Sequence, residues 1–204
     1  MIPIRLQWER PADGVELAFD GDAIRARTHR DIPVTYEVTN LENPIVLHMI
    51  NCRSNEDRIA FLSRFGFLRR EAGWFGMAGV KVEQTRLEES LTEPSFSFVP
   101  PQIHPTEYAN QLMNEGGFQV SLRPSFEEFG DERLRLVLHP DSLASFMAME
   151  VALAHEVGAV STTCAHCRNY FLTGPLTGRR SHAKYCSDRC RVAAMRKRNA
   201  ANGE

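Results

Sequence analysis

The stretch CAHCRNYFLTGPLTGRRSHAKYCSDRC, residues 164–190, decides how the C-terminal part of this chain folds. It holds two cysteine pairs, Cys164 and Cys167 with two residues between them, and Cys186 and Cys190 with three. A two-residue spacing lets a tight turn aim both sulfurs at one point. Residues four apart lie on one face of a helix. The pairs therefore predict one Zn²⁺ held by four thiolates, a closed tetrahedron typical of a structural ion.

The residues between the two pairs have the composition of a small finger. A strand is expected over 170–172, followed by turns at Gly174-Pro175 and Gly178 and a returning strand over 181–185. Ser187 and Asp188 suit the first turn of a helix that continues past the last cysteine. Such a short segment cannot bury a self-sufficient core, so the ion should supply much of its folding free energy.

Other arrangements of these residues remain open at this point. His166 or His182 could replace one sulfur in a Cys₃His set, and the four cysteines could instead be unrelated buried thiols or two disulfides. Five cysteines do not make a disulfide framework in a chain of 204 residues. The chain shows no secretory signal after Met1 and no apolar run long enough to span a membrane. A cytoplasmic, reducing compartment is therefore the expectation.

Two short segments carry a resemblance to a known family. CAHCRNYF at 164–171 and YCSDRCR at 185–191 resemble a treble-clef zinc finger of the YCSxxC type. This segment is similar to the C-terminal CGNR zinc finger of bacterial proteins with an N-terminal ABATE-type domain, although the chain reads CRVA at 190–193, which makes it a cousin of that family. The resemblance implies a stress-related transcriptional regulator whose N-terminal domain senses a ligand.

Charge is distributed unevenly along the chain. The formal net charge is −2, but from Cys164 onward there are nine Lys and Arg against two Asp and Glu, about +7, which leaves about −9 for the part before it. A basic C-terminal segment favours a polyanionic partner. An acidic protein, or the acidic part of this same chain, is the alternative partner.

Basic residues surround the second cysteine pair and continue along the expected helix. Arginine forks fit phosphate oxygens, often with two hydrogen bonds at once. Residues seven apart nearly superpose on a helix, so the arginines form rows. The predicted nucleic-acid-binding residues are Arg179, Arg180, Lys184, Arg189, Arg191, Arg196, Lys197 and Arg198. Tyr170 could stack on a base, or could belong to the packed hairpin.

The part before the finger predicts a mixed domain of strands and helices. Strands are expected at 23–27, 33–39, 118–122 and 133–138, and helices at 54–66, 80–91, 107–114 and 142–157. Ser54 and Asp141 are the expected N-caps, while Gly66 and Gly158 are the expected stops. The glycine- and aromatic-rich stretch 73–79 predicts a loop, and four prolines over 92–105 predict a linker.

Other chemistry-bearing residues are scattered. Cys52 is expected to be a buried thiol, and His104, His139 and His155 could form a second metal site or act as bases. Trp74, between glycines, could line a ligand pocket. The chain contains no phosphate-binding loop, dinucleotide-binding glycine pattern or nucleophile elbow. An enzyme is therefore not favoured, although an enzyme built into the N-terminal part stays open.

The sequence thus predicts an α+β protein in two parts. Residues 1–158 form a mixed strand and helix domain that modulates function through a small ligand or dimerisation, and residues 161–200 form a Cys₄ zinc finger with a basic helix. The predicted function is nucleic-acid binding associated with transcription. The alternative is a non-enzymatic interaction module whose basic finger grips an acidic protein.

Overall fold

The computed structural model describes residues 4–18, 21–70, 76–92, 118–126 and 132–201. In chain order the elements are β1 (Ile4–Pro11), β2 (Val15–Leu17), β3 (Ile24–Ala26), β4 (Asp31–Val38), α1 (Ile45–Ile50), α2 (Asn55–Phe65), α3 (Met77–Thr92), β5 (Phe118–Phe126), β6 (Glu132–Pro140), α5 (Leu143–Glu156), β7 (Val160–Thr163), β8 (Tyr170–Thr173) and α6 (Asp188–Ala201). We call the part up to α5 the body, and the part from β7 onward the finger.

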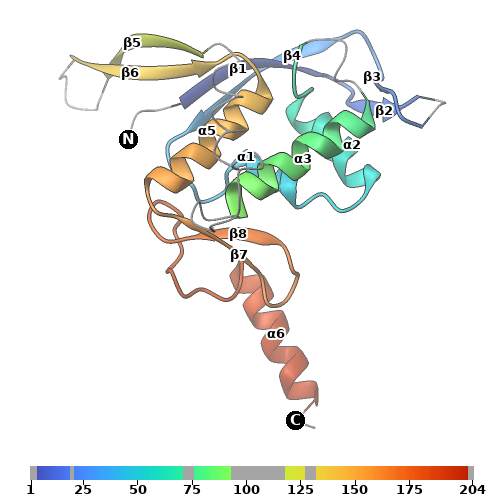
Figure 1. The fold of residues 1–204 in the computed structure, drawn as a ribbon, viewed down its shortest axis with the longest axis vertical. Helices are drawn as coiled ribbons and strands as arrows, with labels where there is room; N and C mark the ends of the chain where they lie inside the picture. Colours follow the sequence, from blue (N-terminus) through green and yellow to red (C-terminus); the bar gives the residue numbers. More distant parts are fainter. Residues whose placement is uncertain (1–3, 19–20, 71–75, 93–117, 127–131, 202–204) are drawn as a thin grey trace, which may run out of the picture.

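A four-stranded sheet in the order β4-β1-β6-β5 forms one layer of the body, and α5, α3 and α2 lie on one side of it (Figure 1). Strand β1 pairs antiparallel with β4 and parallel with β6 at Ile4 and Leu138. Along β1, Leu6 and Trp8 are buried while Gln7 and Glu9 are exposed. This alternation places one face against the core and the other in solvent, and it confirms the α+β class.

Helix α2 forms where its local signals predict it. The Ser54 hydroxyl accepts from the Asp57 N–H at 3.1 Å, and the Asp57 carboxylate accepts from the Ser54 N–H at 2.9 Å, which is a complete capping box. Gly66 ends the helix with φ at +98°. A Cβ at Gly66 would lie 2.9 Å from both the Glu9 carbonyl oxygen and Trp8 Nε1, so glycine is required there.

Helix α5 is buried along most of its length and packs on the sheet beside α1 and α3. Its N-cap is Ser142, so the prediction of Asp141 as the N-cap is wrong. Ser142 has extended backbone angles, and its Oγ accepts from the Ser145 N–H at 3.1 Å. Asp141, one residue further out, accepts the Ser145 hydroxyl at 3.0 Å instead. The nearer oxygen therefore satisfies the backbone donor.

Helix α1 is absent from the sequence-based prediction. It has six residues, too few for a clear period, and Pro44 at its N-cap supplies no side-chain acceptor. The side-chain carboxyl group of Glu150 on α5 takes that role, and its two oxygens accept from the N–H groups of Ile45 at 2.9 Å and Val46 at 2.7 Å. Burial raises the pKa of Glu150 to about 8, although both backbone bonds act to lower it.

A similar contact with a distant residue lets α3 begin at Met77, so the predicted loop over 73–79 is wrong for residues 77–79. Residues 77–79 are the first turn of α3, because the Asp22 backbone carbonyl accepts from the Met77 N–H at 2.7 Å and its carboxylate from the Ala78 N–H at 3.1 Å. The predicted linker over 92–105, the predicted helix over 107–114, Trp74 and His104 lie outside the described residues, apart from Thr92, which ends α3.

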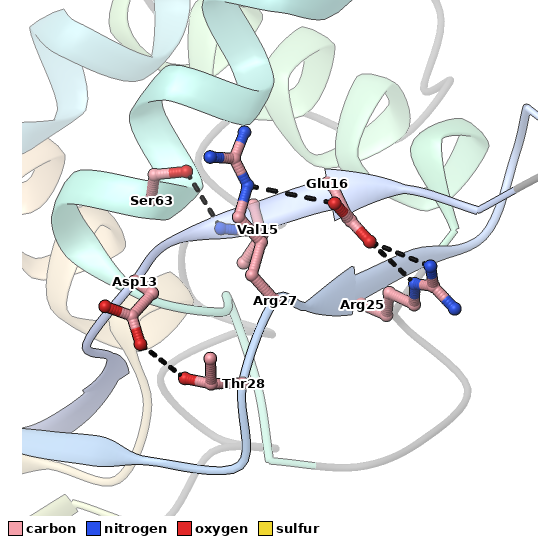
Figure 2. Close-up of polar contacts among 7 residues, drawn as sticks. All are labelled: Asp13, Val15, Glu16, Arg25, Arg27, Thr28 and Ser63. Carbon is pink, nitrogen blue, oxygen red and sulfur yellow. Dashed lines mark hydrogen bonds and ion pairs between the residues drawn. The ribbon is translucent and has the colours of Figure 1, made fainter.

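The short β2–β3 hairpin is attached to α2 at the edge of the body. The Val15 N–H donates to the Ser63 hydroxyl at 3.0 Å, and Glu16 lies between Arg25, 2.8 Å away, and Arg27, 3.9 Å away (Figure 2). These ion pairs are solvent-exposed, so each contributes little to stability. In the described part of the chain, no helix has the length and hydropathy needed to cross a bilayer.

Candidate metal centre

The first cysteine pair lies in the turn between β7 and β8. These strands pair antiparallel from Val160 with Thr173 to Thr163 with Tyr170, so residues 164–169 form the turn. The Cys164 N–H donates to the Asn169 carbonyl at 2.8 Å, and the Arg168 N–H donates back to the Cys164 carbonyl at 3.0 Å. The turn thus closes on itself and brings the two sulfurs of its cysteines together.

The predicted returning strand over 181–185 is wrong. No strand forms there, and the partner of β8 is β7, which precedes the first cysteine. The metal-binding turn itself reverses the chain, so β8 pairs with the residues immediately before that turn. After β8, a bridge between Gly174 and Arg179 closes a turn, and the chain then runs without strand structure to Cys186.

The second cysteine pair is set by the start of α6. The Ser187 hydroxyl accepts from the Cys190 N–H at 3.3 Å, as an N-cap does. Cys186 therefore precedes the helix and Cys190 lies in its first turn, with their sulfurs 3.5 Å apart. The Cys186 N–H points back at the Cys164 sulfur, 3.5 Å away, and joins the two pairs.

All four sulfurs lie within 4.8 Å of one another, and none of the cysteines forms a disulfide. The sulfurs of Cys167 and Cys186 are 3.6 Å apart. A regular tetrahedron with metal–sulfur bonds of about 2.3 Å has edges of about 3.8 Å. The distances of 3.6 Å between Cys167 and Cys186 and 3.5 Å between Cys186 and Cys190 are close to this edge, so the four cysteines can bind one Zn²⁺. His166 and His182 are exposed and do not belong to the cluster.

The electrostatics of the cluster favour a cation at its centre. Burial acts to raise the pKa of Cys164, but backbone N–H groups of Cys167, Cys186 and His166 outweigh it and lower this pKa to about 6. Burial, together with the neighbouring sulfurs, raises the pKa of Cys186 to about 12. Several thiolates this close repel one another unless a cation neutralises them. A divalent ion would supply that charge.

The finger is fastened to the body by hydrogen bonds. Asn51, at the C-terminal end of α1, accepts from the Tyr170 N–H at 2.7 Å and donates to its carbonyl at 2.9 Å. The Arg53 guanidinium donates to the Cys167 carbonyl at 2.8 Å and to Asn169 Oδ1 at 3.0 Å. Leu172 of β8 is fully buried in the core of the body. Body and metal centre therefore share contacts.

The side chain of Tyr170 takes part in the same junction. It packs partly buried against the core, and a hydrogen bond with Glu88 of α3 is the main reason that its pKa is raised. This placement corresponds to the hairpin role, which was one of the two alternatives for this residue.

Arg179 holds the second cysteine pair against the body. Its guanidinium donates to the Cys186 carbonyl at 3.0 Å and to the Glu42 carbonyl at 2.9 Å, and it lies 5.9 Å from the Phe171 ring centroid. Sequence reasoning missed this role because two of these partners are backbone carbonyls, and one of the two, that of Glu42, is 137 residues away. Arg179 therefore belongs to the junction between body and finger and not to the exposed cationic surface.

The other predicted cationic residues are exposed. Arg180 and Lys184 lie on the segment before Cys186 and the remaining five on α6. Helix α6 has no buried residue, and it extends away from the body to the far end of the molecule (Figure 1). It does not lie along the acidic body.

The remaining candidates are not brought together. Within the described ranges the four cysteines are the one cluster suited to a metal. His155 bonds the Ser90 carbonyl at 2.7 Å, and Cys52 is buried, which raises the pKa of its thiol to about 11. A thiol with such a pKa is unreactive at neutral pH.

Comparisons of this chain with models of known protein families, with curated proteins and with solved structures gave no match.

Proposed function

We propose that this chain binds nucleic acid through a zinc-stabilised finger of the treble-clef type, in association with transcription. The observation that carries the proposal is α6, a helix of 14 residues with no buried side chain. A helix of that length is marginal in water without partners. Its first turn is tied to the metal centre through Cys190, so zinc would hold its start while the rest projects outward.

Charge complementarity supports this partner. Helix α6 carries five cationic residues against one carboxylate, that of Asp188. The side chains of Arg189, Arg196, Lys197 and Arg198 make no hydrogen bond or ion pair with any described residue, so their donors are available to phosphates. Several phosphate contacts would release counterions and make affinity fall steeply with salt.

The test is fluorescence anisotropy of the zinc-loaded full chain on labelled duplex DNA and on single-stranded RNA. Affinity should fall at least about tenfold between about 50 mM and 200 mM salt. Arg196→Ala combined with Arg198→Ala should weaken binding at unchanged zinc content. Arg25→Ala with Arg27→Ala removes the same charge from the body and is the matched control. Absence of binding at the lower salt concentration would exclude this function.

A second candidate is a non-enzymatic module that binds an acidic protein. The observation that favours it is Met195 on α6, which is 46% exposed and lies beside Arg196, because methionine and arginine are both enriched in protein interfaces. Polyglutamate is a suitable probe for this candidate. If it competes with nucleic acid at equal charge concentration, the site selects anions in general, and the protein partner becomes the better explanation.

We further propose that the two parts of the chain have separate roles. Residues 161–200 would form the binding finger, and residues 1–158 a regulatory domain that acts on it in the cytoplasm. The support is the direct contact of Asn51 with Tyr170, next to the metal-binding turn, and of Arg53 with Cys167 in that turn. A change in α1 would move the finger. Thermal stability of the body with the finger deleted would test whether 1–158 folds alone.

A further inference from the structure

We infer that α6 enters the major groove of double-stranded DNA, with an apolar strip facing the bases and arginines reaching the phosphates on both edges. This inference rests on the proposed function and names its substrate class. It comes from the arrangement of side chains around the helix axis.

The outer face of α6 lies opposite its metal ligand. At about 100° per residue, Val192, Met195 and Asn199 lie within roughly 40° of the direction opposite Cys190. Cys190 points into the sulfur cluster, so this strip points away from it. Met195 is 46% exposed and Val192 is partly exposed. The outermost strip of a strongly basic helix is thus apolar at its centre.

Arginines flank this strip on both sides. Arg189 and Arg196 lie on one flank and Arg191 and Arg198 on the other, each at roughly 80–120° from Cys190. All four are exposed, and Arg191 also bonds Asp188 at 3.1 Å. A single acidic surface would be matched by cations on one face. Cations on two opposite flanks match two parallel lines of phosphate.

The dimensions agree with a duplex. The major groove is about 12 Å wide and admits one helix, which is about 10–12 Å across with its side chains. A helix of 14 residues is about 21 Å long. In the groove, the apolar strip would meet thymine methyl groups, and Asn199 is of the residue type that pairs with adenine. A single strand offers only one line of phosphates.

A hollow beside the start of α6 leaves room for one of the two phosphate chains. Its volume is about 640 Å³, and its lining includes Lys184, Asp188 and Arg191 from the finger and Glu42 and Asn43 from the body. Asp188 is already paired with Arg191 at 3.1 Å. The Glu42 side chain lies close to Gly178, because a Cβ atom added at Gly178 would be 3.2 Å from the carboxylate of Glu42. This carboxylate would repel a phosphate chain in the hollow, so Glu42→Gln should tighten DNA binding.

The experiment compares two alternating duplexes, poly(dA-dT) and poly(dA-dU), which differ only in the thymine methyl group. The zinc-loaded full chain should bind the dA-dT duplex about 3- to 10-fold more tightly. Met195→Ala should abolish that preference while it leaves binding to the dA-dU duplex nearly unchanged. Arg196→Ala should weaken binding to both duplexes equally. It should also reduce by about 1 the slope of log affinity against log salt concentration. Zinc content and circular dichroism should not change, because both side chains are exposed.

Competition shows which groove is used. Methyl green, a major-groove ligand, should displace the protein, and netropsin, a minor-groove ligand, should not. Equal affinity for the two duplexes, or tighter binding to a single strand of the same length, overturns the inference. If salt-dependent binding persists in that case, the proposed function survives. If the chain binds no nucleic acid, both fall together.

Discussion

The side-chain amide of Asn51 holds the backbone of Tyr170 with two hydrogen bonds, accepting its N–H at 2.7 Å and donating to its carbonyl at 2.9 Å. The two residues are 119 positions apart in the chain. Asn51 ends α1, and Tyr170 begins the strand that follows the first cysteine pair. Together with Arg53, this amide therefore holds the metal-binding turn at its place on the body.

Asn51→Ala should destabilise the protein by about 1–3 kcal/mol, because it leaves two partly buried backbone groups of Tyr170 without partners. Urea unfolding measures the loss, and hydrogen exchange should accelerate at the Tyr170 amide. Asn40→Ala, which removes only an exposed turn contact with Glu42, is the control. Equal stability of the two variants would contradict the assigned role of Asn51.

Arg53→Ala should speed the release of zinc to a chelator by about 3- to 10-fold, since each hydrogen bond of this kind contributes about 1 kcal/mol. The bond to the Cys167 carbonyl steadies the metal-binding turn. A colorimetric chelator assay measures the rate. Arg5→Ala removes an arginine ion-paired to Glu37 on the sheet and should leave the rate unchanged. Identical rates for both variants would show that the body does not influence the metal centre.

Glu150 should make stability depend on pH. Its pKa is raised from 4.5 to about 8 by burial, so the folded protein keeps a proton that the unfolded chain loses. This contribution is fully present below about pH 4.5 and is lost as pH rises toward 8, at up to about 1.4 kcal/mol per pH unit. Unfolding by urea at several pH values measures the slope.

Glu150→Gln gives the comparison for this slope. Glutamine cannot ionise, so the variant should lack this component of the pH dependence. It should also be less stable below about pH 4.5, because its NH₂ group would face one of the two backbone donors of α1. The same pH slope in both proteins would assign the titration to another group.

Cys186→Ser should abolish the binding of zinc, and elemental analysis of the unsubstituted chain should find one ion per chain. The finger should unfold in this variant while the body keeps its helices, which circular dichroism reports. The midpoint of thermal unfolding should also fall, because Leu172 of the finger is buried in the core of the body. Cys52→Ser is the control and should retain its zinc. Complete loss of helical signal would contradict the two-part architecture.

The sequence by itself determined what depends on short spacing. The spacing within each cysteine pair was enough to predict the metal cluster. A tight turn brings Cys164 and Cys167 together, and the start of α6 brings Cys186 and Cys190 together. Helix α2 was predictable because its cap and its stop lie within the segment, at Ser54 and Gly66. The exposure of the cationic residues of α6 was predictable from their charge, and the structure agrees, because no residue of this helix is buried.

Only the tertiary structure decided which distant groups complete these elements. Helix α1 depends on the carboxyl group of Glu150, 105 residues from Ile45, and the start of α3 depends on Asp22. Arg179 has the composition of a surface cation, yet its guanidinium bonds carbonyls on both sides of the junction between body and finger. A backbone donor or acceptor is satisfied by whichever group the packed fold brings within about 3 Å, and local sequence does not encode that choice.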